Sequence, residues 1–290
     1  MEKLRRLIQI ARDDGAFEAC NQSFRFGVNQ LPDFIWRPFV IYGLLQDGRS
    51  FQDIEYLLEN NRDRHDALVG PDRLYSSAIY PKPQTRAQHY YRYVFAANQA
   101  ADRDASSVLD IAAGLSYGTH IFKTKLGSEL EYIAGDISVD ALAYGQKYYS
   151  PDNSIQADGQ NLPLDANSVD IVVSFETMEH IPNVEEYLKE LNRVISPNGD
   201  LFFSVPNDED LDSKEEHNVK EYPHMHVFDY EKFRDTLNRY FSERNLTVYA
   251  QEYPLDVKNP MEVENLPPGF SEVNEQQEIA DQSTLLAHIK

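Results

Sequence analysis

The chain has 290 residues, 41% of them hydrophobic, which is enough for one large domain or for a domain with an appendage. Its 48 acidic and 27 basic side chains give a net charge of −21. Such a charge repels phosphate backbones, so no nucleic-acid partner is expected. The acidity also hints at a high-salt cytoplasm. The single cysteine, Cys20, excludes an internal disulfide framework and a cysteine-based zinc cluster, and no run approaches the roughly 20 apolar residues of a membrane span, which predicts a soluble, cytoplasmic protein.

The first 103 residues are predicted to form a helical N-terminal extension. Leu4, Leu7 and Ile8 lie on one helical face with basic side chains around it. Such a short basic amphipathic helix can contact an anionic membrane surface, although docking on its own domain or on a second subunit is the commoner use of an apolar stripe. Two prolines in "AIYPKPQTRAQ" interrupt the helical pattern, which restarts at Thr85.

From residue 104 onward, short apolar runs alternate with helical patterns. That alternation is typical of an α/β fold in which helices cover both faces of a parallel sheet. We therefore predict one domain over residues 104–290, with an acidic, proline-rich surface insertion at about 254–282 that separates the last two runs. The predicted strands lie in "SSVLDIAA", "LEYIAGD", "NSIQAD", "VDIVVSF", "GDLFFSVPN", "NLTVYAQEY" and "TLLAHIK".

Small residues make up the first turn between a predicted strand and a helix, in "VLDIAAGLSYG" at residues 108–118. Ligands of open α/β sheets bind outside the carboxyl ends of the strands, so this turn must come close to any ligand. Ala112, Gly114 and Ser116 keep the turn slim. Asp110, at the end of the strand, can fix backbone amides of the turn or accept a hydrogen bond from a ligand.

Acidic residues also follow the second and third predicted strands. Asp136 ends the second strand, where a carboxylate can bind both hydroxyls of a ribose. Asp158 and Gly159 begin a polar loop after the third strand that suits the edge of an adenine. A nicotinamide cofactor would satisfy the first two signals, but the first turn lacks G-x-G-x-x-G, which weakens the case for pyrophosphate binding. The pattern favours a ligand that carries one adenosine.

Five segments, "RYVFA", "VLDIAAGLSYG", "GDIS", "QADGQNLPLDANSVDIVVSFETMEHI" and "ELNRVISPNGDLFFSVPN", resemble the class I S-adenosylmethionine-dependent methyltransferases in order and spacing. The match covers roughly residues 86–250, and the nearest group is that of the type-11-like enzymes associated with glycan and natural-product assembly. The resemblance implies a Rossmann-like sheet of about seven strands, of which six are parallel and the last is antiparallel, with S-adenosylmethionine lying across the first strands.

Positions in the family's motifs imply roles for individual residues. Asp110 and Gly114 would face the methionine part of the cofactor, Asp136 its ribose, and Asp158 with Gly159 its adenine. The family usually has glycine where this chain has Ala112 and Ser116, but both are small, so binding is expected to persist. The complete cofactor-binding set that the resemblance implies is Asp110, Ala112, Gly114, Ser116, Asp136, Asp158, Gly159 and Phe175.

The segment "SFETMEHIPN" follows the fourth predicted strand, and in this fold it leaves the sheet beside the transferable methyl group. Methyl transfer is an in-line displacement that gains most from alignment of the reacting groups. A hydroxyl acceptor must also lose a proton, and a histidine is the usual base near neutral pH. His180, together with Glu179, is therefore the predicted catalytic pair.

A metal site is the alternative use of the same segment. Glu176, Glu179 and His180 are spaced i, i+3 and i+4, so one helical turn would bring them to one face, and "HMHVFDY" adds His224 and His226. Such ligands can bind Mg²⁺, Mn²⁺ or Fe²⁺. The E-x-x-E-H spacing with a later histidine is similar to the metal site of small-RNA 2′-O-methyltransferases. Glu176, Glu179, His180 and His226 are the candidate ligands, but no metal is expected, since the glycan-associated enzymes share the spacing without a general metal requirement.

The predicted function is S-adenosylmethionine-dependent methylation, with the oxygen of a sugar, a glycan or another small hydroxylated metabolite as acceptor. One alternative is a metal-dependent 2′-O-methyltransferase that acts on RNA, which the net charge opposes. Another is a non-catalytic protein that binds the cofactor and serves as a partner or scaffold. Residues 1–103, which the resemblance leaves largely uncovered, are predicted to act as a lid that shapes the acceptor pocket.

Overall fold

The structure is a computed structural model that describes residues 50, 52, 83–207, 224–251, 269–273 and 283–290. The chain divides into two compact units, residues 1–89 with 255–266 and residues 90–254 with 267–290. The amphipathic helix predicted at the N-terminus, and with it the predicted membrane contact, lies outside the described residues. Most of the predicted extension and of the predicted insertion lie outside them as well.

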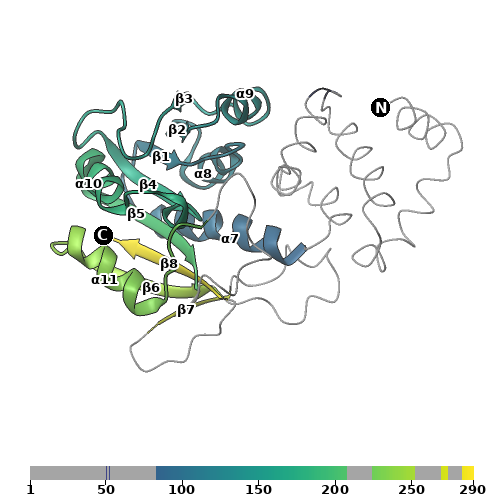
Figure 1. The fold of residues 1–290 in the computed structure, drawn as a ribbon. Coiled ribbons are helices and arrows are strands. Elements are labelled where there is room, and N and C mark those ends of the chain that lie inside the picture. The colour runs from purple at the N-terminus through teal and green to yellow at the C-terminus, as the bar shows by residue number, and fades with distance from the viewer. Residues whose placement is uncertain (1–49, 51, 53–82, 208–223, 252–268, 274–282) are drawn as a thin grey trace, which may run out of the picture. The chain divides into compact units, whose positions relative to one another are not determined.

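The described residues form one eight-stranded mixed sheet in the order β3-β2-β1-β4-β5-β8-β6-β7 (Figure 1). β1 to β6 share one direction, and β7 and β8 run the opposite way. This arrangement confirms the predicted α/β, Rossmann-like class, because β1 and β4 lie side by side at the point where the strand order reverses. The strands are β1 (Ser107–Ile111), β2 (Glu131–Asp136), β3 (Asn153–Gln156), β4 (Val169–Phe175), β5 (Ile195–Pro206), β6 (Leu246–Gln251), β7 (Phe270–Glu272) and β8 (Thr284–Ile289).

The sheet has one strand more than the seven that the sequence predicts. The additional strand, β7, lies inside the stretch predicted as an insertion and pairs with β6, so that Tyr249 lies opposite Glu272 and Gln251 opposite Phe270. Its three residues are too few to show the alternation by which a strand is recognised in a sequence. The predicted antiparallel strand is β8, which lies between β5 and β6.

Capping residues set the start of several helices. Ser138, Asn183 and Asp229 are N-caps whose side chains each accept a backbone N–H from the residue three positions later. A short 3-10 turn, η2, spans Met178–His180. The α-helices among the described residues are α7 (Pro83–Ala100), α8 (Gly118–Leu126), α9 (Val139–Tyr148), α10 (Val184–Val194) and α11 (Tyr230–Tyr240).

Helices cover both faces of the sheet, as Figure 1 shows. On one face, Leu201 and Phe203 of β5 belong to a core that also includes buried side chains of α10 and α11. Because successive strand residues point to opposite faces, Ser204 faces the other way, where its hydroxyl accepts a hydrogen bond from Arg92 of α7 at 3.1 Å. Burial of both faces explains the almost continuous apolar runs of the central strands. In the described part of the chain, no helix has the length and hydropathy needed to cross a membrane.

Candidate active site

The turn between β1 and α8 has a left-handed backbone conformation. Ala112, Gly114 and Ser116 have φ angles of 60°, 55° and 62°. Glycine adopts this region freely, whereas alanine or serine there costs roughly 1–2 kcal/mol. The backbone N–H of Ala113 donates to the carbonyl of Gly135 at 3.0 Å, which joins the turn to β2. The chain therefore keeps a glycine-type turn at two positions where it has no glycine.

Two glycines let the adjacent elements approach this turn closely. A Cβ at Gly145 of α9 would lie 2.5 Å from the Oγ of Ser116, and a Cβ at Gly118 of α8 would lie 2.3 Å from the Tyr132 hydroxyl oxygen. Ser116 is fully buried, and its hydroxyl has no hydrogen-bond partner among the described residues. Neither glycine can be replaced without moving its neighbours, so the turn is held from both sides.

Asp110 lies inside the fold and is 1% exposed. Its carboxylate accepts a hydrogen bond from the Tyr132 hydroxyl at 2.6 Å and another from the Tyr93 hydroxyl at 3.1 Å. Burial raises the pKa of Asp110 from 3.8 to about 7, although both hydrogen bonds act in the opposite direction. The sequence did not indicate these tyrosine partners. Asp110 thus links α7, β1 and β2 from within, and its contact with a cofactor stays a prediction.

Asp136 joins the end of β2 to the turn that follows β1. One carboxylate oxygen accepts the backbone N–H of Gly114 at 2.7 Å, and the other accepts the backbone N–H of Ser138 at 2.8 Å. An ionised carboxylate has about four acceptor positions, so each oxygen keeps room for one further donor. The side chain therefore orders the turn and can still receive two hydroxyl groups.

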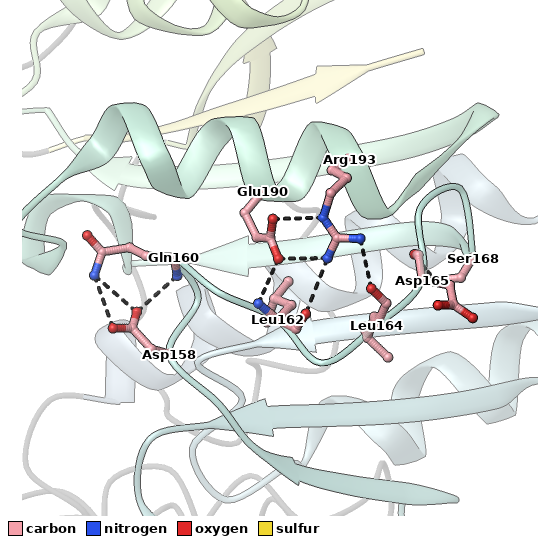
Figure 2. Close-up of polar contacts among 8 residues, drawn as sticks. All are labelled: Asp158, Gln160, Leu162, Leu164, Asp165, Ser168, Glu190 and Arg193. Carbon is pink, nitrogen blue, oxygen red and sulfur yellow. Dashed lines mark hydrogen bonds and ion pairs between the residues drawn. The ribbon is translucent and has the colours of Figure 1, made fainter.

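The loop after β3 carries the predicted adenine-binding residues. Asp158 is exposed and accepts hydrogen bonds from the backbone and side-chain nitrogens of Gln160 at 2.9 and 3.1 Å (Figure 2). The side-chain oxygen of Gln160 accepts the backbone N–H of Asn183 at 3.1 Å, which connects this loop to the start of α10. A Cβ at Gly159 would lie 2.4 Å from the Tyr187 ring, so glycine is needed there for packing.

An ion pair on α10 holds the continuation of this loop. Arg193 donates to both carboxylate oxygens of Glu190, at 2.8 and 2.7 Å, and its remaining N–H groups donate to the carbonyls of Leu164 at 2.8 Å and Leu162 at 3.2 Å. Glu190 in turn accepts the backbone N–H of Leu162 at 2.7 Å. Figure 2 shows the pair lying against the loop. This clamp fixes the backbone a few residues beyond Asp158.

The three predicted cofactor-binding acids share one edge of the sheet. Strand register places Asp110 opposite Ala134 and Asp136 opposite Gln156, so the carboxyl ends of β1, β2 and β3 lie next to one another. The charge of Asp136 is close enough to contribute to the raised pKa of Asp110. Of the three side chains, Asp158 alone is exposed. The edge is thus acidic and carries the turn of residues 112–116 beside it.

Glu176 lies outside the only short turn of this segment, so the arrangement in which one helical turn would bring Glu176, Glu179 and His180 to one face does not form. Glu176 has a φ of 50° and forms an ion pair with Arg92 at 2.8 Å, supported by the Ser204 hydroxyl at 2.9 Å. Arg92 is 1% exposed, so its side of this ion pair is buried. Only Met178–His180 form a turn, which separates Glu176 from the next glutamate.

Glu179, His180 and His224 converge instead. One ligand-type atom from each lies within 4.8 Å of the other two. Glu179 is 2% exposed, its carboxylate lies 3.9 Å from Nε2 of His180, and the rings of His180 and His224 are 4.7 Å apart. His226, the histidine that the sequence favoured as a ligand, points elsewhere, because its Nε2–H donates to the carbonyl of Ile181 at 2.9 Å.

Three aromatic rings pack together around Tyr93, whose hydroxyl donates to Asp110. The Tyr93 ring lies 5.0 Å from the ring of Tyr117 and 5.0 Å from that of Phe175, both in edge-to-face geometry. Tyr117 and Phe175 are 6% and 8% exposed, so packing accounts for most of their surface. A contact between Phe175 and a cofactor stays a prediction.

Comparison with known proteins agrees with this geometry. A family described as a methyltransferase domain matches residues 109–203, from β1 into β5. A probable S-adenosylmethionine-dependent methyltransferase of Mycobacterium tuberculosis is 32% identical over 103 residues, which make up 36% of this chain and 36% of that protein. This part of the chain is a class I S-adenosylmethionine-dependent methyltransferase domain. A demethylmenaquinone methyltransferase of Staphylococcus saprophyticus is 31% identical over 100 residues, 33% of this chain and 43% of that one.

The methyltransferase domain also has the fold of solved structures. The plantazolicin methyltransferase BpumL, solved in complex with SAH, has a TM-score of 0.54 at 15% identity over 93% of this chain and 98% of that chain. Identity this low establishes the fold alone. The chain spans little more than a third of the length of the Mycobacterium tuberculosis relative. The cofactor-binding and catalytic roles of the residues named above stay predictions.

Proposed function

We propose that the chain transfers a methyl group from S-adenosylmethionine to a hydroxyl group of a small acceptor, such as a sugar, a glycan or another hydroxylated metabolite. One observation carries the proposal: the acidic sheet edge of β1 to β3 and the cluster of Glu179 with His180 flank the junction of β1 and β4. A ligand bound across that junction would have a nucleoside subsite on one side and ionisable side chains on the other.

The residues present fit an adenosine-bearing sulfonium ligand. Asp136 offers one free acceptor position on each oxygen for two ribose hydroxyls, and the exposed carboxylate of Asp158 can accept the amino group of adenine. The left-handed turn at Ala112, Gly114 and Ser116 brings the backbone close to the ligand. The negative charge of this sheet edge also favours binding of the positively charged sulfonium group. When bound, S-adenosylmethionine supplies an electrophilic methyl group.

In this proposal, His180 takes the proton of the acceptor. In the overall reaction the acceptor oxygen gains the methyl group, the sulfur keeps the electrons of the broken carbon–sulfur bond, and one proton is released. The imidazole of His180 receives that proton, and the buried carboxylate of Glu179, 3.9 Å from Nε2, stabilises the imidazolium.

A carbon acceptor is a second candidate, because several relatives are named for quinone chemistry. One is the demethylmenaquinone methyltransferase, and another is a ubiquinone/menaquinone biosynthesis C-methyltransferase from Hahella chejuensis, 29% identical over 121 residues. An activated ring carbon also has to lose a proton, so the same histidine would serve. RNA is disfavoured by the net charge of −21.

The test combines cofactor binding with product detection. Isothermal calorimetry with S-adenosylhomocysteine should show one site in the full chain, and a lack of measurable affinity would overturn the proposal. Cell extracts incubated with the protein and a methyl-labelled cofactor should contain one labelled product, whose carbon shift distinguishes an O-methyl from a C-methyl group. His180→Gln should bind S-adenosylhomocysteine as wild type does and should lose the product. His120→Gln, an exposed histidine on α8, is the control.

A further inference from the structure

Two segments distant in the sequence are pinned together at the acceptor side. The carbonyl of Glu179 accepts the backbone N–H of Met225 at 2.7 Å and that of His226 at 3.1 Å, and the ring of His226 donates to Ile181. These bonds fix the backbone of residues 224–226 against η2. The backbone therefore holds the segment that carries His224 beside Glu179 and His180.

We propose that Glu179, His180 and His224 hold a divalent transition-metal ion such as Mn²⁺, Fe²⁺ or Zn²⁺. They are the group of ligand-type residues that converges within the described part of the chain, and their ligand atoms already lie within 4.8 Å of one another. Donors bonded to such an ion at about 2.0–2.2 Å lie roughly 3–4 Å apart, so small side-chain rotations complete the site. Two imidazoles with one carboxylate suit these ions better than Mg²⁺ or Ca²⁺, which prefer all-oxygen ligands.

Burial and charge favour the ion. The Glu179 carboxyl group is 2% exposed, and ionising a carboxylate that deep in protein is costly unless a cation compensates it. The two partly exposed imidazoles would supply neutral ligand atoms on the solvent side, where an ion can enter. A net charge of −21 raises the local concentration of cations around the whole protein.

Three protein ligands leave coordination positions for an acceptor oxygen. Placing the ion in the reaction rests on the proposed function, whereas binding of the ion does not. A coordinated hydroxyl has a lower pKa, so in the loaded protein it would lose its proton to solvent and His180 would act as a ligand. In the metal-free protein the same histidine would serve as the base.

The chain offers matched controls for each ligand. His226 lies two residues from His224 but donates to the Ile181 carbonyl, and Glu176 lies three residues before Glu179 but pairs with Arg92. Substituting either control residue removes an imidazole or a carboxylate of the same kind without removing a proposed ligand. If metal binding is weaker in only one variant of a pair, the residue substituted in that variant is a ligand.

The experiment titrates the EDTA-stripped 290-residue chain with Co²⁺ and with Mn²⁺. Wild type should bind one ion, with cobalt absorption bands that report nitrogen ligands. Glu179→Gln and His224→Gln should each weaken binding at least tenfold. Glu176→Gln should stay within about twofold of wild type, and His226→Gln, which loses the hydrogen bond of the imidazole to Ile181, should weaken binding less than His224→Gln. Absence of a bound ion, or equal weakening in both members of a pair, would overturn the metal site. S-adenosylhomocysteine affinity, measured on the same samples, tests the proposed function separately, because Asp136 and Asp158 are not part of the cluster.

Discussion

The carboxylate of Asp136 accepts the backbone N–H of Gly114 at 2.7 Å, so the acid that ends β2 closes the turn that leaves β1. The second oxygen accepts the N–H of Ser138, which is the N-cap of α9. One side chain therefore orders a turn and the start of a helix, and it does so at the edge where the proposed ribose subsite lies. Cofactor binding and local order are expected to depend on the same residue.

Replacing Asp136 should weaken both properties. In Asp136→Asn, one acceptor oxygen becomes an amide group whose hydrogens face a backbone N–H, which leaves a nearly buried donor unpaired. We expect a loss of about 1–3 kcal/mol in the free energy of unfolding and at least a tenfold weaker affinity for S-adenosylhomocysteine. Urea denaturation and calorimetry measure the two effects.

The exposed Asp102→Asn removes the same charge from the surface and should leave both measurements unchanged. If Asp136→Asn bound S-adenosylhomocysteine with wild-type affinity, the ribose assignment would be wrong.

The sequence predicted the sheet because its signals are local. Short apolar runs with an acid at or next to their last residue mark β1 and β2, and they remain visible without any knowledge of their neighbours. The extra strand β7 has only three residues, and pairing with β6, rather than its own pattern, makes it a strand. Fold class was thus available from the sequence, and the exact strand number was not.

The sequence indicated which segments form the site, but not where their side chains point. The carboxylate of Glu176 forms its ion pair with Arg92 of α7. Arg92 is far from Glu176 in the sequence, so no local pattern indicates this pair. His224 and His226 look equivalent in "HMHVFDY", and only the hydrogen bond from His226 to Ile181 separates them. The tyrosines that hold Asp110 lie on α7 and β2, so nothing near Asp110 in the sequence announces them.

Ser116 carries two local costs that glycine would remove. Its φ of 62° is unfavourable for a residue with a side chain, and its buried hydroxyl has no hydrogen-bond partner among the described residues. Ser116→Gly should raise the free energy of unfolding by about 1–2 kcal/mol, after subtraction of the roughly 0.5–1 kcal/mol that glycine loses in backbone entropy. Thermal and urea denaturation check this value.

Ser150→Gly separates the two causes. Ser150 has a φ of 52° but is exposed, so glycine there relieves the backbone without removing a buried hydroxyl. We expect a gain of at most about 0.5–1 kcal/mol, in line with glycine at the end of a helix. A larger gain at Ser150 than at Ser116 would show that the buried hydroxyl carries no cost.

Arg193→Lys should loosen the loop that carries Asp158. Lysine lacks the planar fork that reaches Glu190 and the carbonyls of Leu162 and Leu164 together. Amide hydrogen exchange should accelerate over residues 158–165, and S-adenosylhomocysteine should bind several-fold more weakly. Lys189→Gln, which breaks the exposed ion pair with Glu185 on the same helix, should change neither result. Faster exchange with unchanged affinity would place the adenine subsite elsewhere.

Asp110 should make stability depend on pH. Its pKa is about 7 in the folded protein and near 3.8 when the chain is unfolded, because burial disfavours the charged form. The native state therefore holds a proton that the unfolded state releases, so stability from this group is complete below about pH 4 and is lost as pH rises through 7. The shift corresponds to about 4 kcal/mol between those limits.

Asp110→Asn tests this dependence, since an amide oxygen can accept from both tyrosines and does not ionise. Other acids also repel one another more as pH rises, so the informative quantity is the difference between wild type and variant at each pH. The variant should gain on wild type by about 1.4 kcal/mol per pH unit between pH 4 and 7, and the difference should then level off. A difference that stays constant from pH 4 to 8 would mean that Asp110 titrates alike in both states. Its burial against Tyr93 and Tyr132 would then not perturb the carboxyl group.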